Sequence, residues 1–373
     1  MSQLLRGRPG SGRPGLAITL GDPAGIGAEV ALKALARAAL ARVRAVLIGD
    51  VETLRETAAR LRLRLRLVAV TEAEVAGGAL GRRQAWPTRP GERLVPVVAA
   101  SALGPRARRP GRPSIEGGRA SRHYVEVATR LAQVGAVSAI VTAPISKEWV
   151  ARAGFPAGGH TELLQKLTGA REVRMMLAGR RLRVVLVTTH LALAAVPRSL
   201  TMQGVLRTIL VADEHLRQYH RVERPRIAVA GLNPHAGEGG LFGSEERALI
   251  APAVAQARRA GVAVSGPFPA DSLFVRAVEG AFDAVVAMYH DQGLIPLKLL
   301  HFHDGVNVTL GLPILRTSPD HGTAHDIAGR GVADERSMVA AIRLAASMAR
   351  ARRAEDAATA LAPAASGARR RQA

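Results

Sequence analysis

The sequence predicts an α/β protein built from two α/β/α domains with largely parallel, doubly wound sheets. Continuously apolar segments of strand length alternate with amphipathic helical segments along most of the chain, which is typical of strands that helices cover on both faces. Polar side chains recur directly after the apolar segments, at Asp22, Thr142, His190, His235, Asp271 and His290. Ligands of parallel sheets bind beyond the carboxyl ends of the strands, so we expect one shared crevice.

The elements are predicted from the period of the apolar residues and from turn residues between them. Strands are expected over 16–20, 44–50, 139–143, 173–178, 182–189, 226–231, 262–266, 283–289 and 306–311. Helices are expected over 28–40, 51–61, about 115–134, from 145, about 200–220, 244–260 and about 335–352. The segment LRLRLRL (61–67) alternates with period two and fits a strand with exposed arginines, whereas 73–114, rich in Gly, Pro and Arg, is expected to be irregular.

The order of these elements predicts how the domains divide the chain. The first domain is expected to be discontinuous, comprising 15–150 and about 305–352, with 151–304 as the second domain and the active site in the cleft between them. The ends, 1–14 and 353–373, have a composition that cannot bury a core and are expected to be disordered tails.

The composition limits the classes of function. The net charge of +22 is typical of nucleic-acid-binding proteins, which are the alternative to an enzyme. Lysine occurs only four times, much of the arginine lies in the tails and in 104–112, and aromatic residues make up 3%, so a stacking surface for single strands is lacking. The chain has no cysteine, which excludes disulfides and thiolate sites. The sequence also lacks a membrane-length apolar run and a signal segment, which predicts a cytoplasmic protein.

Two groups of residues are candidates for binding small ligands. GDPAGIG (21–27) lies between a strand and a helix, where backbone amides could meet a phosphate; a tight turn, or Asp22 as a helix cap, explains it equally well. Three histidines follow apolar strands, and three neutral imidazoles at one place would suit a divalent ion. The alternative is three unrelated loop histidines bonded to backbone, at His190, His235 and His290.

Two basic residues are candidates for holding an anion. Lys298 follows Asp291 by one or two helical turns, and Arg316 follows another apolar segment. Together they could clamp a carboxylate or phosphate, or each could be an ordinary surface charge.

The assembled motifs strongly resemble the 4-hydroxythreonine-4-phosphate dehydrogenase family of pyridoxal phosphate biosynthesis. The resemblance covers about 15–350 and is carried by GDPAGIG, VTAPISK (141–147), GGHTELL (158–164), VTTHLAL, GLNPHAGEGGLFGSEE, GPFPADSLF (266–274), AMYHDQGLIPLK and GVNVTLGLPILRTSPDHGTAHDIAG (305–329). The stretch DHGTAHDIAGRGVAD also looks like the adenosine-binding loop of isocitrate and isopropylmalate dehydrogenases, which implies an isopropylmalate-dehydrogenase-like fold.

The resemblance implies roles for residues that match the family's motifs. It implies a divalent metal (Zn, Mg, Co or Mn) held by His190, His235 and His290, with ligands from both chains of a homodimer whose interface lies on the second domain. It implies substrate contacts from His160, Thr161, Lys298, Asn307 and Arg316. The adenosine loop implies NAD or NADP bound by His321, Gly322, Thr323 and Asp326, and an aspartate there favours NAD because it would accept bonds from the ribose hydroxyls.

The implied reaction is the oxidation of 4-phosphooxy-L-threonine at its 3-hydroxyl, followed by decarboxylation to 3-amino-2-oxopropyl phosphate. The group that accepts the hydroxyl proton stays open among Asp271, Asp291 and Lys298. The nearest alternative is a sister enzyme that acts on 4-phospho-D-threonate or 4-phospho-D-erythronate in acid-sugar breakdown. Leu294 and Ile295 in DQGLIPLK look more like the biosynthetic branch.

Overall fold

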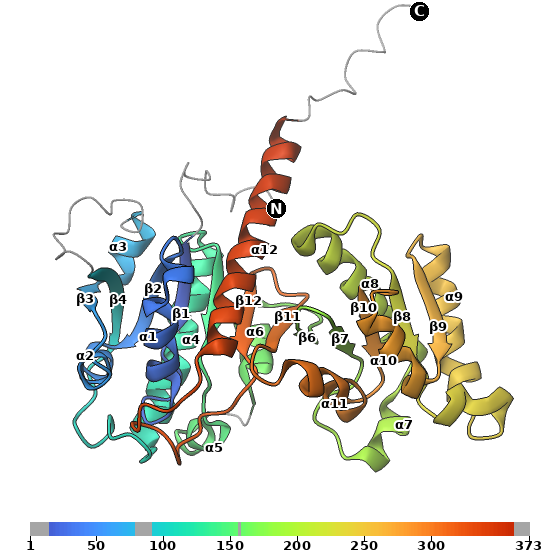
Figure 1. The fold of residues 1–373 in the computed structure, drawn as a ribbon, viewed down its shortest axis with the longest axis horizontal. Helices are drawn as coiled ribbons and strands as arrows, with labels where there is room; N and C mark the ends of the chain where they lie inside the picture. The colour runs from blue at the N-terminus through green and yellow to red at the C-terminus, as the bar shows by residue number, and fades with distance from the viewer. Residues whose placement is uncertain (1–14, 79–91, 156–157, 362–373) are drawn as a thin grey trace, which may run out of the picture.

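A computed structural model describes residues 15–78, 92–155 and 158–361, and these form one large sheet covered by helices (Figure 1). The strand order is β3-β4-β2-β1-β5-β12-β11-β6-β7-β10-β8-β9. The strands are β1 (Gly15–Thr19), β2 (Arg44–Asp50), β3 (Leu65–Val70), β4 (Arg93–Ser101), β5 (Ala139–Thr142), β6 (Arg174–Ala178), β7 (Arg183–Leu186), β8 (Ile227–Ala230), β9 (Val264–Phe268), β10 (Ala284–Ala287), β11 (Val306–Leu310) and β12 (Arg316–Pro319).

The helices form two rows, one on each face of the sheet. On one face α2, α1, α12, α8 and α9 contact one another in succession; on the other α3, α4 and α6 cover one half, and α10 and α11 cover the other. The helices are α1 (Gly27–Ala36), α2 (Val51–Arg60), α3 (Glu72–Ala76), α4 (Ile115–Gln133), α5 (Lys147–Arg152), α6 (His160–Thr168), α7 (Val196–Ser199), α8 (Met202–His220), α9 (Ala251–Arg259), α10 (Ala270–Val278), α11 (His290–His301) and α12 (Arg336–Leu361), with short turns η1 (Ala38–Leu40), η4 (Leu193–Ala195), η5 (Pro234–Gly240) and η6 (Glu246–Ile250).

The sheet consists of two parallel blocks joined by an antiparallel centre. The strands from β3 to β12 run parallel, and so do β7, β10, β8 and β9. Strand β11 pairs antiparallel with β12 and with β6, and β6 pairs antiparallel with β7. The two blocks therefore run in opposite directions. The α/β class with a mostly parallel sheet is confirmed; the division into two domains stays a prediction, since one sheet joins their strands.

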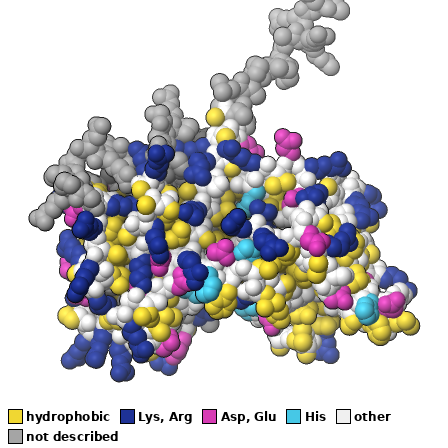
Figure 2. Space-filling view, viewed as in Figure 1, with side chains coloured by type: hydrophobic (Ala, Val, Ile, Leu, Met, Phe, Trp, Pro, Cys, Tyr) yellow, Lys and Arg dark blue, Asp and Glu magenta, His cyan; other side chains and the backbone are white. Residues whose placement is uncertain are grey.

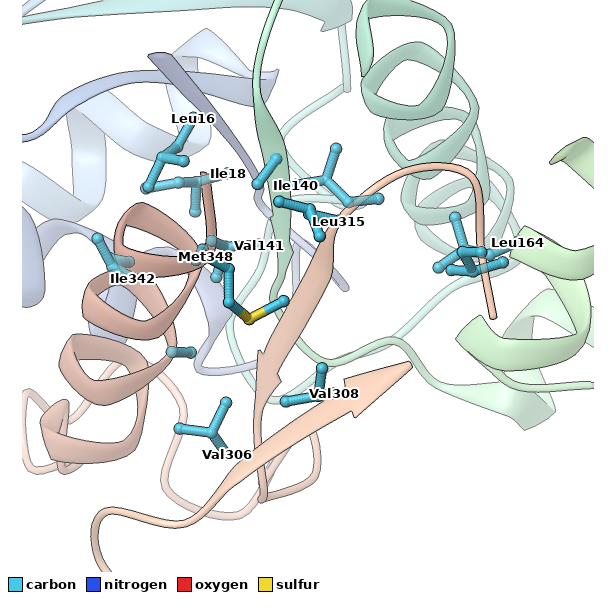
Figure 3. Close-up of a cluster of buried hydrophobic side chains, with 14 of the residues drawn as sticks. Leu16, Ile18, Ile140, Val141, Leu164, Val306, Val308, Leu315, Ile342 and Met348 are labelled. Atoms are coloured by element: carbon cyan, nitrogen blue, oxygen red, sulfur yellow. The ribbon is translucent and has the colours of Figure 1, made fainter. Parts of the chain in front are cut away.

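The main core lies between the first parallel block and helix α12 (Figure 3). Ile18 of β1 and Ile140 of β5 are fully buried, as are Ile342 and Met348 of α12. Burying an aliphatic side chain of this size contributes roughly 1.5–3 kcal/mol. This packing fixes α12 across the middle of the sheet, beside the strands that carry the candidate site.

Two expectations for the first block need correction. The alternating segment 61–67 does expose Arg62, Arg64 and Arg66, but the strand starts only at Leu65. The prediction that 73–114 is irregular is wrong in part, because α3 extends into this segment and β4 lies within it. In the sheet, β4 lies between β3 and β2. Pro96 made β4 hard to predict, since proline cannot donate a backbone hydrogen bond to a sheet and normally marks an edge strand or the end of a strand.

The last strand and the last helix also differ from expectation. Strand β12 was not predicted, because RTSP has no apolar pattern, yet all four residues are buried. Its polar groups are satisfied by partners such as the Ala341 carbonyl, which accepts from Thr317 Oγ1 at 2.9 Å. The expectation of disorder from 353 is wrong for 353–361, which continue the alanine-rich α12; the rest of that tail, and 1–14, lie outside the described residues. No helix in the described ranges is long and apolar enough to span a membrane.

Candidate active site

A pocket of about 350 Å³ lies over the antiparallel centre of the sheet, on the face that carries α6 and α11. Its floor is one face of three strands, because Leu177 of β6 pairs in register with Asn307 of β11, which pairs with Ser318 of β12. Its walls are the start of α6, the middle of α11 and the loop after β12. The polarity of β12 is thereby explained, since this strand supplies part of a binding surface.

The pocket brings together most of the residues predicted from sequence, and leaves out others. Its lining includes His160, Thr161, His190, His290, Lys298, Asn307, Arg316, His321 and Gly322. Its lining does not include His235, Asp271, Asp291, Thr323 or Asp326.

Arg316 is a buried cation in the floor of the pocket. Its side chain donates to Thr142 Oγ1, to Thr309 Oγ1 at 3.0 Å and to Asn307 Oδ1 at 3.3 Å. Burial lowers the pKa of the guanidinium to about 9, although nearby Glu162 opposes this shift, so it stays charged at neutral pH. A buried charge held by neutral groups is costly, and an anionic ligand would offset that cost.

Two lysines add to this positive charge. Lys298 lies 3.2 Å from Asp320 (Nζ to Oδ2), and both residues line the pocket. Lys147 also lines the pocket and was not assigned a role from sequence, although its motif was noted. The available signal was the scarcity of lysine in this chain. Three cations and the carboxylates of Glu162 and Asp320 line the pocket, an excess of one positive charge (3 − 2 = 1) that favours an anionic ligand.

His160 and His321 each bring a buried nitrogen that has no partner. The Nε2 atoms of both rings are inaccessible and make no hydrogen bond within the described structure. Burial holds the pKa of His160 well below its usual value, and Arg316 and Lys147 lower the pKa further. His160 is therefore neutral at pH 7. Buried polar atoms are nearly always hydrogen-bonded, so these two point to a bound ligand or water as the missing partner.

His190 and His290 form a pair whose geometry suits a metal ion. Their ring centroids are 5.7 Å apart, close to the separation of about 5 Å for two imidazoles that bind one ion through nitrogens about 2 Å away. Partial burial lowers the pKa of His190, as do Lys147 and His290, which favours the neutral ligand form. Asp291 Oδ1 lies 2.7 Å from His290 Nδ1, a carboxylate partner that leaves Nε2 available for coordination.

The third predicted ligand, His235, lies elsewhere in the fold. No cluster of three or more His, Asp or Glu suited to a metal ion occurs within the described part of one chain. One chain thus brings two of the three predicted metal ligands, His190 and His290, to the pocket. The chemistry of this pair fits a divalent ion.

The His235 loop has an unusual left-handed backbone. Six consecutive residues have positive φ, from His235 (+52°) to Gly240 (+110°), including Ala236 and Glu238. This conformation costs non-glycine residues roughly 1–2 kcal/mol each, and such strain clusters at functional sites. The loop therefore presents an exposed His235 at a defined position.

Glu246 holds this loop in place from the following helix. Its Oε1 accepts from the backbone amides of Leu232 and Asn233, both at 2.7 Å, and its Oε2 accepts from Asn233 Nδ2 at 3.0 Å. Burial raises the pKa of this carboxyl, but the hydrogen bonds outweigh burial and the net pKa is lowered. No role was assigned to Glu246 from sequence, because its partners Leu232 and Asn233 are 14 and 13 residues away along the chain.

The two carboxylates considered as proton acceptors lie outside the pocket of their own chain. Asp291 is exposed and bonded to His290. Asp271 is exposed at the start of α10, where its Oδ1 accepts from Ser272 N at 2.8 Å. Helix α10 contacts the η5 turn that carries His235, so Asp271 belongs to the same corner of the molecule as His235.

The GDPAGIG loop supports the predicted adenosine loop rather than a phosphate. Ile26 N donates to the Thr323 carbonyl at 3.0 Å, Gly25 N donates to the Asp22 carbonyl, and Ala24 N donates to Asp22 Oδ1. These amides are already used, so the phosphate-cradle interpretation is wrong for them. Asp22 does not cap α1, whose N-cap residue is Ile26; its other oxygen lies 3.1 Å from His325 Nε2. Asp326 is exposed nearby.

Fold and pocket together define an α/β enzyme with a positively charged pocket beside paired imidazoles. The family model for pyridoxal phosphate biosynthetic protein PdxA matches residues 41–345, and the chain belongs to this family. It is 50% identical over 343 residues to 4-hydroxythreonine-4-phosphate dehydrogenase of Geobacter metallireducens, with 91% of this chain and 96% of that protein covered. The predicted dehydrogenase family is confirmed, and the chain is an oxidoreductase.

Two further comparisons define the breadth of the family. The chain is 45% identical over 338 residues to D-threonate 4-phosphate dehydrogenase of Salmonella typhimurium, with 90% of this chain and 98% of that protein covered. The crystal structure of 4-hydroxythreonine-4-phosphate dehydrogenase from Klebsiella pneumoniae superposes with a TM-score of 0.79 at 43% identity, covering 90% of this chain and 99% of that chain.

Proposed function

We propose that this enzyme oxidises 4-hydroxythreonine 4-phosphate at its 3-hydroxyl and releases carbon dioxide to give 3-amino-2-oxopropyl phosphate, a step of pyridoxal phosphate biosynthesis. The observation that carries the proposal is the meeting of three cations with an imidazole pair in one pocket. The substrate has a phosphate and a carboxylate on either side of the reacting carbon. The names of the relatives support the same reaction.

The pocket residues suit the two anionic groups of this substrate. Arg316 has a planar guanidinium that can bind a carboxylate or phosphate through two parallel hydrogen bonds. Lys298 and Lys147 supply point charges to the same pocket. His160 is neutral, so its unpartnered Nε2 can donate to, or accept from, an oxygen of the substrate. We assign substrate binding to these residues together with Thr161 and Asn307.

The chemistry divides between bound groups and the protein. A divalent ion on His190 and His290, completed by His235, would stabilise negative charge on the reacting oxygen, and NAD(P) would accept the hydride. Loss of the hydroxyl proton and the hydride gives a β-keto acid; its C–C bond to the carboxylate then breaks, carbon dioxide leaves, and the electron pair moves to the ketone oxygen. The resulting enolate takes up a proton at the carbon that lost carbon dioxide, which gives 3-amino-2-oxopropyl phosphate. The proton acceptor stays open among Asp271, Asp291 and Lys298; Lys298 lines the pocket, but there it is paired with Asp320 as a cation.

The cofactor assignment rests on the loop that GDPAGIG supports. His321, Gly322, Thr323 and Asp326 would hold the adenosine half, and an exposed Asp326 carboxylate favours ribose hydroxyls over a 2′-phosphate. We therefore propose NAD as the preferred cofactor. Measured kcat/KM with NAD should exceed that with NADP, and Asp326→Ser should narrow the difference. The cytoplasmic location stays a prediction.

A homodimer would bring His235 to the pocket of the partner. Exposed apolar side chains form a stripe on α11 at Ile295, Leu299 and Phe302, and the His235 loop exposes Leu241 and Phe242. Figure 2 shows hydrophobic side chains on the surface of the half that contains these elements. Contiguous exposed apolar side chains mark interaction surfaces, and residues i, i+4 and i+7 share one face of a helix.

Mixing inactive variants tests this arrangement. His190→Ala and His235→Ala homodimers should each lack activity, but a heterodimer of the two has one pocket with all three histidines. Random reassociation should restore about one quarter of wild-type activity, because half of the dimers are mixed and each has one intact site. The matched control mixes His190→Ala with His290→Ala, both of which line the same pocket.

The outcomes separate the possibilities. Recovery in the first mixture and none in the control supports a site shared between chains. Recovery in neither mixture removes His235 from the partner's pocket. Full activity of His235→Ala alone would remove this histidine from the mechanism.

The acid-sugar substrates remain the second candidate, because relatives of similar identity are named D-threonate 4-phosphate dehydrogenase. The Leu294–Ile295 pair is weak evidence for the biosynthetic substrate over the acid-sugar substrates, since Leu294 lines the pocket but Ile295 is 60% exposed. Turnover measured with 4-hydroxythreonine 4-phosphate and with 4-phospho-D-threonate decides between them. A higher kcat/KM for the second substrate would overturn the primary assignment.

A further inference from the structure

A second cavity, of about 630 Å³, lies on the opposite face of the same central strands. Its floor includes Ala178 of β6 and Val306 of β11, which are partners in the sheet register. Its sides come from the end of α1, the end of α8 and the first turns of α12. The volume lies within the range of about 300–1,000 Å³ that is usual for small-molecule sites.

The cavity and the candidate active site are separated by one layer of backbone. Neighbouring residues of a strand point to opposite faces. Leu177 and Asn307 therefore face the active pocket, whereas the adjacent Ala178 and Val306 face the rear cavity. The rear cavity is thus a separate space and not an extension of the first.

The rear cavity has an excess of positive charge. Five arginines and two carboxylates line it: Arg37, Arg180, Arg183, Arg336, Arg343, Asp304 and Glu335. The difference is three positive charges (5 − 2 = 3). Such an excess around a concave surface attracts anions.

The two carboxylates of the lining are already engaged. Glu335 Oε1 accepts from Arg37 Nε at 2.7 Å. Asp304 Oδ1 lies 3.0 Å from His301 Nδ1. The charge of Glu335 is therefore compensated by Arg37, and Asp304 has a hydrogen-bond partner, before any ligand enters.

Three of the arginines lack such a partner. Within the described chain, no carboxylate lies within ion-pair distance of Arg180, Arg183 or Arg343. Arg183 donates only to the backbone carbonyl of Asp283, at 3.2 Å. Arg336, by contrast, is paired with Asp334 just outside the cavity. Three guanidinium groups remain for an anion.

The rest of the wall is apolar. Val339, Ala340 and Leu344 of α12 face Ala178 and Val306 of the sheet across the cavity. His220 also lines it, and its buried Nε2 has no hydrogen-bond partner. A ligand that matches this lining has an anionic group at one end and an apolar body at the other.

We propose that the rear cavity is a binding site for a small organic anion, a phosphate or carboxylate attached to an apolar body. The anionic group binds Arg180, Arg183 and Arg343, and the body packs against the α12 side chains. This assignment is independent of the reaction at the other face.

Phenyl phosphate, titrated calorimetrically into the full-length protein, tests the proposal. This probe can occupy both pockets, so each is disabled in turn: Lys298→Glu for the active pocket, and Arg343→Glu or Ala340→Phe for the rear cavity. Arg343 is exposed and Ala340→Phe fills space, so neither change should unfold the chain, which circular dichroism checks. Arg350→Glu is the matched control, an exposed arginine of α12 outside the cavity lining.

We expect a binding event that survives Lys298→Glu. It should weaken roughly tenfold or more in Arg343→Glu and in Ala340→Phe, as for loss of a charge-assisted contact, and should be unchanged in Arg350→Glu. Benzyl alcohol, the neutral counterpart, should not bind at this site. The proposal fails if all binding disappears in Lys298→Glu, if Arg350→Glu weakens it as much as Arg343→Glu, or if benzyl alcohol binds equally well.

Discussion

The guanidinium of Arg316 donates two hydrogen bonds to one hydroxyl oxygen, that of Thr142, at 3.1 Å from Nε and 2.8 Å from Nη2. The two residues lie on the neighbouring parallel strands β12 and β5. Since its partners are neutral, Arg316 is held rigidly without losing its charge to a carboxylate. The strand ladder thereby orients a cation toward the ligand before the ligand arrives.

Replacing Arg316 by lysine should impair substrate binding more than stability. Lysine keeps the charge but loses the planar fork that bonds Thr142 and a bound anion at once. Losing one charge-assisted bond costs about 2 kcal/mol, so kcat/KM should fall by roughly thirtyfold, mostly through KM. Steady-state kinetics and thermal unfolding check this. Unchanged KM in a folded Arg316→Lys enzyme would contradict the assignment.

Asp291→Asn should weaken metal binding without changing the fold. The carboxylate lies 2.7 Å from His290 Nδ1, and loss of such a partner typically costs 10–100-fold in metal affinity or activity. Isothermal titration with Zn²⁺ or Co²⁺ measures the affinity, and excess metal should restore part of the turnover. Glu148→Gln, which changes an exposed carboxylate of α5 paired with Arg152, is the control and should bind metal normally.

Glu246→Gln should loosen the His235 loop. The amide keeps one acceptor oxygen for Leu232 and Asn233 but turns a donor toward Asn233 Nδ2, so a buried bond is lost at a cost of about 1–3 kcal/mol. Hydrogen exchange over 231–245 should quicken and activity should fall. The carboxylate of Glu245 accepts a single bond from Asn233 Nδ2, so Glu245→Gln should have a smaller effect than Glu246→Gln. Equal exchange rates in the two variants would count against an anchoring role for Glu246.

His220 should make the protein less stable in mild acid. Burial lowers its pKa to about 4, and Arg183 adds to the effect; in the unfolded chain the usual value is about 6.5. Between these values the unfolded state binds more protons, so the free energy of unfolding falls as pH is lowered from 6.5 toward 4 and is unaffected by this group above 6.5. The loss from pH 7 to 5 is about 2 kcal/mol.

Denaturant unfolding at pH 7 and pH 5 measures this loss. His220→Gln cannot take up a proton, so its unfolding free energy should fall less over the same interval. An identical fall in the variant and the wild type would show that other groups cause the acid sensitivity.

The sequence predicts the pair His190 and His290 well, because both follow apolar strands that prove to be parallel neighbours, β7 and β10. By the same reasoning His235, which follows the adjacent β8, should join them. It does not line their pocket, because the left-handed loop and the bonds to Glu246 direct it elsewhere. Those bonds depend on tertiary contacts, which no local pattern reveals.

The polar floor of the pocket was harder to predict than its rim. Strand β12 has no apolar period to reveal it, since Thr317 and Ser318 are buried only because neighbouring elements satisfy their polar groups. Lys147 had no signal beyond its rarity. The antiparallel pairing at the centre of the sheet likewise cannot be predicted from the sequence of any one strand, because it depends on which strands become neighbours in the fold.

Leu177 and Asn307 line the active pocket, whereas their neighbours Ala178 and Val306 line the rear cavity, so the lengths of β6 and β11 must be kept. Deleting or inserting a single codon within β6 or β11 would rotate every following side chain of that strand by half a turn. In β6 Leu177 would exchange faces with Ala178, and in β11 Asn307 would exchange faces with Val306, so a length change in either strand would alter the active pocket and the rear cavity together. Length changes in this family should therefore be confined to the connecting loops. We expect β6 and β11 to tolerate substitutions better than insertions or deletions, because only the latter change which face each side chain occupies.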